Sequence, residues 1–133
     1  MPFDKQREEF EARAKRAKAM GSPKRLAERK AASILNARER LALLIDKDTF
    51  VEAGLFATSI KPDDRDKTPG DGVVSGFGKV AGRMVGVNAA DFTTLGSSSA
   101  EVHGKKQYYV RETCRKNGMP MVSLMECAGG RIP

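Results

Sequence analysis

Two loops of small residues are the part of the sequence best suited to chemistry. Gly96-Ser97-Ser98-Ser99 precedes a helical segment, and Glu126-Cys127-Ala128-Gly129-Gly130-Arg131 follows an apolar run. Neither loop supplies an obvious acid, base or nucleophile. Both offer backbone N–H groups with little bulk in front of them, which can bind an anionic or carbonyl oxygen and stabilise charge that develops on it. Ordinary turns remain the alternative for both loops.

Three side chains near these loops could react, but the sequence pairs none of them with a catalytic partner. His103 is the only histidine, and no nearby serine or cysteine is spaced to use it as a base, which favours packing or hydrogen bonding. Lys106 lies on or beside an apolar helix face, where its stem can pack and its head can reach a phosphate. Cys127 lacks a base that would make it a nucleophile.

A β-α-β unit is predicted to position both loops. Residues 83–92 read as a strand, Ser98-Ser99-Ala100-Glu101 as a capping box that starts a helix at about Ser99, and Asn117-Gly118 as the end of that helix. The apolar run 121–125 is typical of a parallel strand buried on both sides. Because such a unit brings the ends of both strands to one edge, the two loops should lie side by side.

Local signals also predict the faces of that helix and the elements upstream. One face should carry Val102, Tyr109, Val110 and Thr113, and the other Lys105, Arg111 and Arg115. Upstream, the sequence predicts helices over residues 4–20 and 23–35, the second with Ser22 as cap and Pro23 at its first position, and a third helix opened by an Asn36/Glu39 capping box, with Leu41, Leu44 and Ile45 on one side. A short strand or crossover is expected within residues 49–56, followed by an exposed charged loop at 61–72. Residues 73–80 and 83–90 should then form a hairpin around Ala81-Gly82.

Composition describes one modest soluble domain with a basic arm. The chain has 133 residues and a net charge of +7, and residues 1–40 hold 12 Lys/Arg against 6 Asp/Glu, so most of the charge lies there. No apolar stretch is long enough to span a bilayer, and the N-terminus lacks a secretory apolar region. Cys114 and Cys127 follow no metal-ligand or disulfide spacing. We therefore expect a cytoplasmic protein with no bound metal and no membrane partner.

Several short motifs follow one another along the chain. They are Ala37-Arg38-Glu39-Arg40 with Leu43-Leu44-Ile45-Asp46, Phe50-Val51-Glu52, Gly70-Asp71-Gly72-Val73-Val74, Gly82-Arg83-Met84-Val85, Asp91-Phe92-Thr93, Glu101-Val102-His103 with Lys106, and Gly129-Gly130-Arg131-Ile132. Their order and spacing together resemble the carboxyltransferase (beta) subunits of biotin-dependent acyl-CoA carboxylases, within the crotonase-like superfamily. The resemblance covers roughly residues 35–133.

The resemblance implies an α/β fold with a crotonase-like (ClpP/crotonase) β-β-α repeat, present in part, and a helical N-terminal arm. Residues 1–46 would form the basic arm, and residues 47–133 the start of an acyl-CoA-binding carboxyltransferase domain. The implied reaction needs no side-chain base, because carboxybiotin gives up CO2, the freed biotin nitrogen takes the α-proton of an acyl-CoA, and the enolate attacks CO2. The implied partners are acyl-CoA, a biotin carboxylase or biotin carrier subunit that holds the biotin, and further copies in a homo-oligomer.

Alignment on Arg131 carries the family's site onto this sequence. The enolate oxygen would be held by the backbone amides of Ala128 and Gly129, with Gly130 after them. Ala128 stands where the family prefers glycine, so a left-handed backbone there would be strained. The substrate-binding residues would be Gly96, Ser97, Ser98, His103 and Lys106, with Ser97 in place of the family's usual second glycine. The zinc-ribbon cysteines of the bacterial acetyl-CoA branch are missing, which favours the propionyl, methylcrotonyl or related branches.

Two other functions stay open. A decarboxylase of the same family would run the transfer in reverse onto biotin. A basic interaction module would instead bind nucleic acid or a protein partner through residues 1–40, although a solvated helical face is the simpler reading of that charge and nucleic acid is the less favoured partner. Family members are several times longer, so we expect a fragment or truncated product that is inactive in transcarboxylation alone and prone to self-association.

Overall fold

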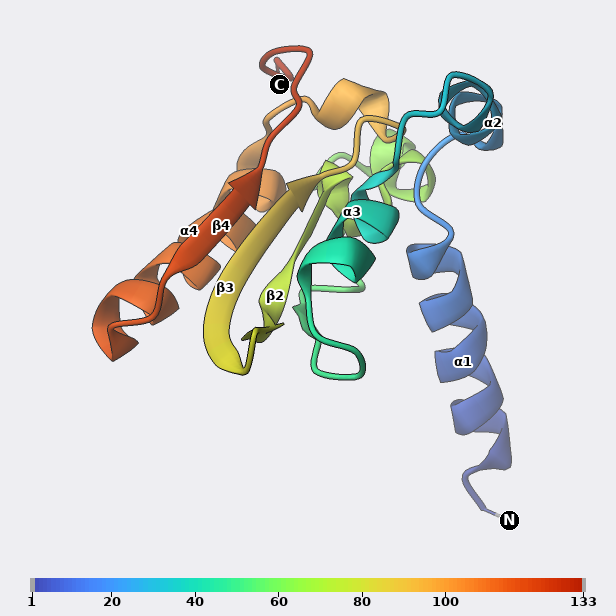
Figure 1. The fold of residues 1–133 in the computed structure, drawn as a ribbon. Helices are drawn as coiled ribbons and strands as arrows, with labels where there is room; N and C mark the ends of the chain where they lie inside the picture. Colours follow the sequence, from blue (N-terminus) through green and yellow to red (C-terminus); the bar gives the residue numbers. More distant parts are fainter. Residues whose placement is uncertain (1, 133) are drawn as a thin grey trace.

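Four strands form one mixed sheet at the centre of the computed structural model, which describes residues 2–132. They are β1 (Val51–Ala53), β2 (Val73–Val80), β3 (Arg83–Ala90) and β4 (Met121–Leu124), in this order across the sheet. The first three pair antiparallel, whereas β4 runs parallel to β3. Two helices, α3 (Ala37–Leu44) and α4 (Glu101–Asn117), lie on opposite sides of the sheet (Figure 1). This confirms the predicted α/β class and the β-α-β unit.

The hairpin of β2 and β3 has the turn that its sequence predicts. Val80 pairs with Arg83, which leaves Ala81 and Gly82 as a two-residue turn. Both have positive φ, 48° and 77°, the combination that a type I′ turn requires. The carboxylate of Asp46 accepts hydrogen bonds from both turn amides, at 3.0 and 2.8 Å. The hairpin is thereby fixed to the segment that follows α3.

Helix α3 packs on one face of the sheet and supplies much of the hydrophobic core. Its start is the predicted capping box: the Glu39 N–H donates to Asn36 Oδ1 at 2.9 Å, and the Asn36 N–H donates to Glu39 Oε2 at 2.8 Å. Gly78 on β2 lets the helix end come close, because a Cβ there would lie 2.7 Å from Ile45 Cγ2. The buried residues of this core are Ala37, Leu41, Ile45, Val74, Val85, Val87 and Ala89.

Helix α4 packs on the other face, very close to β3. A Cβ on Gly86 would lie 2.2 Å from Cys114 Sγ and 2.8 Å from Val110 Cγ1, so glycine is what lets the helix approach this near. The helix ends at Asn117, and Gly118 takes the left-handed conformation, as predicted.

The buried side of α4 differs from the predicted face. It consists of His103, Lys106, Val110 and Cys114, whereas Tyr109 is 55% exposed. The prediction was correct for Val110 and for Lys106, which was placed on or beside this face, but it included the exposed Tyr109 and omitted His103 and Cys114. The predicted outer face is confirmed, since Lys105, Arg111 and Arg115 are exposed.

The serine capping box predicted at the start of α4 is wrong. The helix begins at Glu101, and its N-cap, Ala100, offers no side-chain cap. Ser98 Oγ instead accepts a hydrogen bond from Arg131 Nε at 3.2 Å, and the Ser99 N–H donates to a carbonyl of the C-terminal loop at 2.9 Å. A side chain from far along the chain caps the helix, because Asp71 Oδ2 accepts from the His103 N–H at 2.8 Å.

Strand β4 is an edge strand rather than the fully buried strand that was predicted. Within the described residues it has a neighbour, β3, on one side only. Met121 is 39% exposed and Met125 just beyond the strand is 50% exposed. Val122 and Leu124 point to the other face and pack against the core.

The N-terminal arm consists of α1 (Asp4–Lys18) and α2 (Pro23–Ala31), neither of which has a buried residue. Pro23 begins α2 as predicted, but the helix ends before residue 35, and Ser33 follows with a positive φ of 56°. Figure 1 shows α1 beside the sheet, with the start of this helix far from the loop that follows β4. The division at residues 46 and 47 stays a prediction, and its outer limits, residues 1 and 133, lie outside the described residues.

The charged segment before β2 is folded, so the prediction of an exposed loop holds for most of residues 62–67 and is wrong at the end of the segment. It contains two 3-10 helices, η1 (Pro62–Lys67) and η2 (Pro69–Gly72). Thr68 and Asp71 are both 0% exposed. Thr68 Oγ1 accepts from the Ser59 N–H at 2.9 Å and donates to the Asp64 carbonyl at 2.8 Å. The polar composition concealed side chains that satisfy one another inside the fold.

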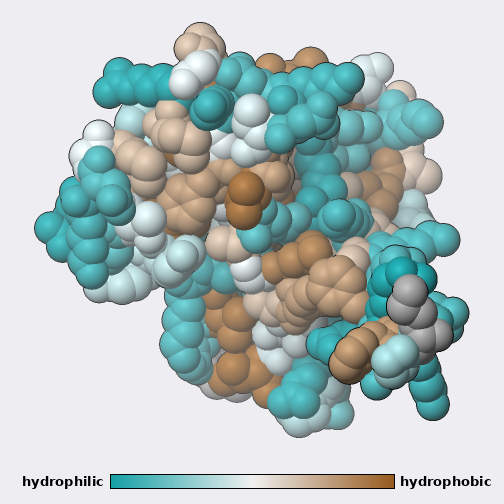
Figure 2. Space-filling model, turned by 90° about the horizontal axis from the view of Figure 1, so that it is seen from below, coloured by the Kyte–Doolittle hydropathy of each residue, from teal (hydrophilic) through white to brown (hydrophobic). Residues whose placement is uncertain are grey.

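Large apolar side chains also reach the surface. Leu43 is 78% exposed on α3 and Val51 is 69% exposed on β1. Figure 2 shows hydrophobic residues gathered in the middle of one face, with hydrophilic residues around them. Among residues 2–132, no helix combines the length and the apolar character needed to cross a membrane.

Candidate functional site

The two small-residue loops lie side by side, as predicted from the parallel unit. They follow β3 and β4, and an isolated parallel bridge joins Ser99 to Gly130. Three backbone hydrogen bonds hold them together. The donors and acceptors are Ala128 N–H to Gly96 O at 2.9 Å, Ser99 N–H to Gly129 O at 2.9 Å, and Arg131 N–H to Ser99 O at 2.8 Å.

The amides of residues 128–130 differ in what they donate to. The N–H of Ala128 is engaged by Gly96 O, so it is unavailable to a ligand unless that hydrogen bond breaks. The N–H of Gly129 meets only the sulfur of Cys127, at 3.3 Å, which is a weak acceptor. The N–H of Gly130 has no acceptor within residues 2–132. Gly129 and Gly130 are exposed residues, and a Cβ on either would meet no atom within 4 Å, so the described residues leave two of the three predicted donors uncrowded.

The strain expected at Ala128 is not present. Ala128 does not have a positive φ, whereas Gly129 has a φ of 139°, a region that glycine tolerates best. Gly96 also has a positive φ, 64°, and a Cβ on it would lie 2.7 Å from the Cβ of Ala128. The close contact of the loops therefore depends on a small residue at position 96.

Arg131 fixes the C-terminal loop through three hydrogen bonds of its guanidinium group. Nη1 donates to Asp71 Oδ1 at 2.7 Å, Nη2 to the Ser98 carbonyl at 3.0 Å, and Nε to Ser98 Oγ at 3.2 Å. Asp71 belongs to one of the family-like motifs, but the sequence predicted no role for it. Its position between two glycines was the only available signal, and the expectation of an exposed loop hid it.

The predicted contact residues Ser97 and Ser98 are occupied within the protein. Ser97 is 0% exposed, has a φ of 50°, and donates from Oγ to the Gly72 carbonyl at 2.8 Å. Ser98 accepts the two remaining hydrogen bonds of Arg131, from Nη2 at its carbonyl and from Nε at its Oγ. Their side chains thus support the loops, and the exposed serine of this loop is Ser99.

His103 has a structural environment. It is 1% exposed, Nδ1 lies 2.9 Å from the Asp71 carbonyl and Nε2 lies 3.0 Å from the side-chain amide of Gln107. A neutral ring that donates from Nδ1 and accepts at Nε2 satisfies both contacts. Burial lowers the pKa of His103 below its usual 6.5, against the opposing effect of Asp71. The ring is therefore not directed at a substrate, which agrees with the hydrogen-bonding role inferred from sequence.

The depressed pKa predicts a loss of stability on the acid side. The unfolded chain takes up a proton on His103 near pH 6.5 and the folded chain at a lower pH, so the free energy of unfolding should fall as pH drops below 6.5. The charged groups that act on the ring are Asp71, Lys106 and Arg131. The NMR titration of the single imidazole, beside urea unfolding at several pH values, tests this. A ring that titrates above pH 6.5, or a His103→Gln variant with unchanged pH dependence, would contradict it.

Lys106 is 7% exposed and supports the turn that carries Asp71. Its Nζ donates to the Gly70 carbonyl at 2.7 Å and to the Val73 carbonyl. Burial lowers the pKa of Lys106 from 10.5 to about 8, although the charges of Glu52 and Asp71 favour the ammonium form. The structure thus places this ammonium on backbone carbonyls, not on an open path to a phosphate.

A second ion pair, absent from the sequence predictions, ties the arm to the site. Arg29 on α2 donates from both terminal nitrogens to the Glu126 carboxylate, each at 2.8 Å. This hydrogen bonding raises the pKa of Arg29 and lowers that of Glu126. Glu126 begins the C-terminal loop, and Arg40 lies 3.9 Å from the same carboxylate. No local pattern links residues so far apart in the chain.

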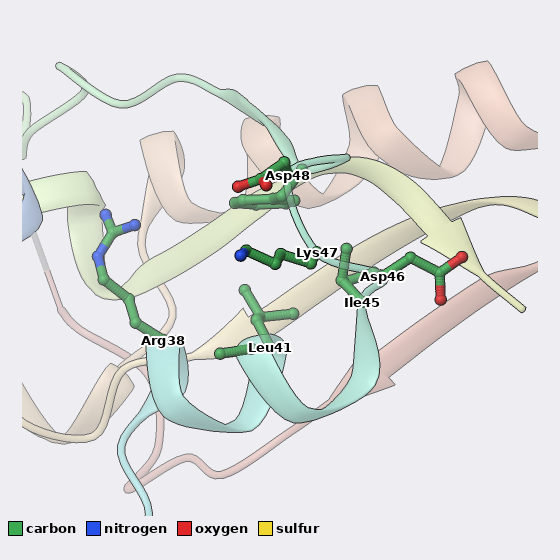
Figure 3. A pocket seen from close by; sticks show the side chains of 8 residues that line it. Arg38, Leu41, Ile45, Asp46, Lys47 and Asp48 are labelled. Atoms are coloured by element: carbon green, nitrogen blue, oxygen red, sulfur yellow. The ribbon is translucent and has the colours of Figure 1, made fainter. Parts of the chain in front are cut away.

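A separate hollow lies beside α3 (Figure 3). It has a volume of about 330 Å³. Arg38 borders it and donates to the Glu52 carboxylate at 2.8 and 3.0 Å. Its lining residues are Arg38, Leu41, Ala42, Ile45, Asp46, Lys47, Asp48 and Phe50, none of which was predicted to contact substrate. The described residues contain no group of three or more metal-ligating side chains.

A family model described as "Carboxyl transferase domain" matches residues 28–133. The chain belongs to the carboxyl transferase family. The resemblance stated from the motifs is therefore confirmed, and the match begins within the arm, on α2.

The relatives of this chain include carboxylases and decarboxylases. The chain is 38% identical over 128 residues to a propionyl-CoA carboxylase beta chain of Roseobacter denitrificans, covering 94% of this chain and 25% of that protein. It is 38% identical over 118 residues to a methylmalonyl-CoA decarboxylase subunit alpha of Veillonella parvula, covering 86% and 23%. The chain thus spans about a quarter of the length of these carboxyl transferase relatives.

Solved structures of the family share the fold. A transcarboxylase 12S structure, a hexamer with methylmalonyl-CoA and methylmalonic acid bound, superposes with a TM-score of 0.89 at 30% identity, covering 96% of this chain and 26% of that one. A single-chain long-chain acyl-CoA carboxylase gives a TM-score of 0.82 at 27% identity, covering 95% and 14%. The crotonase-like class inferred from the motifs is confirmed as a partial domain.

Proposed function

We propose that this chain forms the acyl-CoA-binding part of a carboxyltransferase, which moves a carboxyl group between biotin and the α (or vinylogous) carbon of an acyl-CoA. One observation carries the proposal: the pairing of the two loops leaves Gly129 and Gly130 exposed, and neither N–H has a backbone acceptor within the described residues. Adjacent glycine amides without side chains suit a thioester oxygen that becomes an enolate oxygen.

The work of the chain in this reaction is binding and charge stabilisation. Amides fixed 2.7–3.1 Å from the developing oxyanion typically contribute ~10²–10³-fold to kcat. Biotin, held by a partner protein, would supply the CO2 and the nitrogen that takes the α-proton. The residues at hand fit that division, because His103 and Lys106 are buried and bonded to protein groups, so neither is placed to act as a base.

A decarboxylase subunit remains the second candidate. The decarboxylase relative from Veillonella parvula is as similar in sequence as the carboxylase relative from Roseobacter denitrificans. Both directions of carboxyl transfer pass through an enolate, so the same amides would serve either. The fold of residues 2–132 supports the chemistry and leaves its direction to the partner that supplies or receives the carboxyl group.

The basic arm favours a structural role over a nucleic-acid module. Arg29 is bonded to Glu126, and Arg40 donates to the Ala90 carbonyl at 2.6 Å, so part of the positive charge is used inside the fold. Arg13 lies over the Phe56 ring at 5.2 Å. These contacts dock the arm on the body.

The purified chain should bind acyl-CoA but not turn it over. In an isotope-labelled sample, propionyl-CoA should shift the NMR signals of the Gly129 and Gly130 amides, and free CoA, which lacks the thioester oxygen, should not. No carboxylation should follow when a carboxylated biotin carrier is added. Turnover by this chain alone would contradict the proposed division of labour. Shifts confined to residues 2–40 on addition of random duplex DNA, with strong salt dependence, would favour the interaction module.

A further inference from the structure

Asp71 is a buried carboxylate in a strained position. It is 0% exposed and its backbone has a φ of 47°, a left-handed conformation that aspartate adopts at a smaller cost than most residues but that glycine adopts most readily. Removal of a carboxylate from water is also unfavourable unless the group is paired and hydrogen-bonded. A residue that persists under both penalties is held by its surroundings, and positions of this kind cluster at functional sites.

The three acceptor atoms of Asp71 each bind a different donor. Oδ1 accepts from Arg131, Oδ2 from the His103 N–H at the start of α4, and the carbonyl from His103 Nδ1. Lys106 holds the same turn from the other side through the Gly70 carbonyl. The carboxylate therefore joins helix α4 to the C-terminal loop in one buried network, and its two oxygens serve separable purposes.

Arg131 is the residue that immediately follows the two accessible amides. On one side of Gly129 and Gly130 the loop is pinned by the Ala128 N–H, and on the other by Arg131. The Arg131 side chain is 12% exposed, and its guanidinium group lies between Asp71 and Ser98 and bonds both. Between these two anchors, the Gly129 carbonyl accepts from the Ser99 N–H, whereas the described residues offer the two glycine N–H groups only the weak sulfur contact of Gly129.

We propose that Asp71 and Arg131 are positioning residues that hold the Gly129 and Gly130 amides in the orientation needed to bind the acyl oxygen. The inference rests on the proposed function and extends it to residues that never touch the substrate. Donors to a developing oxyanion must be fixed to within ~0.5 Å, and glycines cannot achieve this by their own conformational preference. A guanidinium group that bonds a buried carboxylate through Nη1 and Ser98 through Nη2 and Nε adds a fixed point beside them.

The alternative is that Asp71 only stabilises the fold by capping α4. The two purposes can be separated, because Asp71→Asn keeps an oxygen for the His103 N–H while its amide group opposes Arg131. Arg131→Lys leaves the cap intact and replaces the planar fork by a single ammonium. Arg115→Lys is the matched control, since Arg115 is exposed and pairs with Glu112 on the outer side of α4.

The test uses the 133-residue chain, ¹⁵N-labelled, with propionyl-CoA labelled with ¹³C at the carbonyl. In the wild type, the Gly129 and Gly130 amides should show order parameters near ~0.85, and in Arg131→Lys and Asp71→Asn values below ~0.6. The bound carbonyl carbon should move downfield in the wild type and lose most of that shift in both variants, while affinity for propionyl-CoA changes little. Arg115→Lys should match the wild type in both measurements.

Two outcomes would overturn the inference. One is an Arg131→Lys chain, folded as judged by α4 amide exchange, in which both glycine amides stay rigid. The other is a bound carbonyl whose shift is the same in Arg131→Lys and the wild type. If Asp71→Asn fails to fold, Arg131→Lys alone decides. Failure of the proposed function is distinguishable, because propionyl-CoA would then not bind to the wild type, whereas the order parameters would still report on the anchoring.

Discussion

Gly129→Pro should lower kcat by ~10²–10³-fold, the usual cost of one oxyanion donor. Proline removes the N–H, and its ring fixes φ near −65°, far from the 139° that Gly129 adopts. The measurement needs a complete enzyme, such as the Roseobacter denitrificans propionyl-CoA carboxylase with its matching segment replaced by this chain. Initial rates of propionyl-CoA carboxylation would then compare the variant with the unsubstituted hybrid.

Two neighbouring substitutions serve as controls for that loss. Cys127→Ser should retain most of the rate, because no thiolate chemistry is proposed and a hydroxyl can accept the Gly129 N–H in place of the sulfur. Ala128→Gly should also be tolerated, because the backbone at this position has no positive φ and the N–H of residue 128 can still donate to the Gly96 carbonyl. A Cys127→Ser hybrid as inactive as Gly129→Pro would indicate a nucleophilic cysteine, and the oxyanion assignment would have to be abandoned.

The sequence predicted those parts of the fold that short-range signals determine. The Ala81-Gly82 turn, the Asn36/Glu39 capping box and the stop at Gly118 all lie within a few residues of the groups they satisfy. The meeting of the two loops was also predictable, because a parallel β-α-β unit leaves its strand ends at one edge. Local turn and cap motifs, with the topology of a β-α-β unit, were sufficient to predict these features.

The errors arose where a long-range contact replaced a local one. The Ser98 cap was wrong because Arg131, 33 residues away, binds that serine and Asp71 caps the helix instead. The buried face of α4 was only partly predicted, because His103 is buried by polar partners that no periodicity reveals. The donor role of Ala128 stays a prediction: the motif gives the order of the amides, and the structure adds that the Ala128 N–H is bonded to the Gly96 carbonyl.

The Arg29–Glu126 pair shows the same limit on a larger scale. Read along the chain, residues 1–40 were a basic arm with a choice of external partners. In the fold, an arm guanidinium and a carboxylate at the start of the C-terminal loop form a two-pronged contact. A bidentate pair of this kind is geometrically specific. The arm therefore helps to place the segment that carries the candidate oxyanion donors.

Gly86→Ala should destabilise the fold by ~1–3 kcal/mol, the usual cost of overpacking a filled core. The added methyl would lie 2.2 Å from Cys114 Sγ and 2.8 Å from Val110 Cγ1, so α4 would have to move away from β3. Urea unfolding of the chain measures the effect. Since α4 carries His103, which bonds Asp71, and Lys106, which bonds the carbonyls on either side of Asp71, the same shift should also disturb the Gly130 amide signal.

Gly104→Ala on α4 is the matched control. A Cβ at position 104 meets nothing within 4 Å and lies on the exposed side of the helix, so alanine should stabilise the chain by up to ~1 kcal/mol through helix propensity. Cys114→Ala combined with Gly86→Ala should recover part of the loss, because it removes the nearest atom. If Gly86→Ala is as stable as Gly104→Ala, α4 does not pack this closely on β3. The bonds from His103 and Lys106 on α4 to the turn that carries Asp71 would then lack the close helix packing on which they depend.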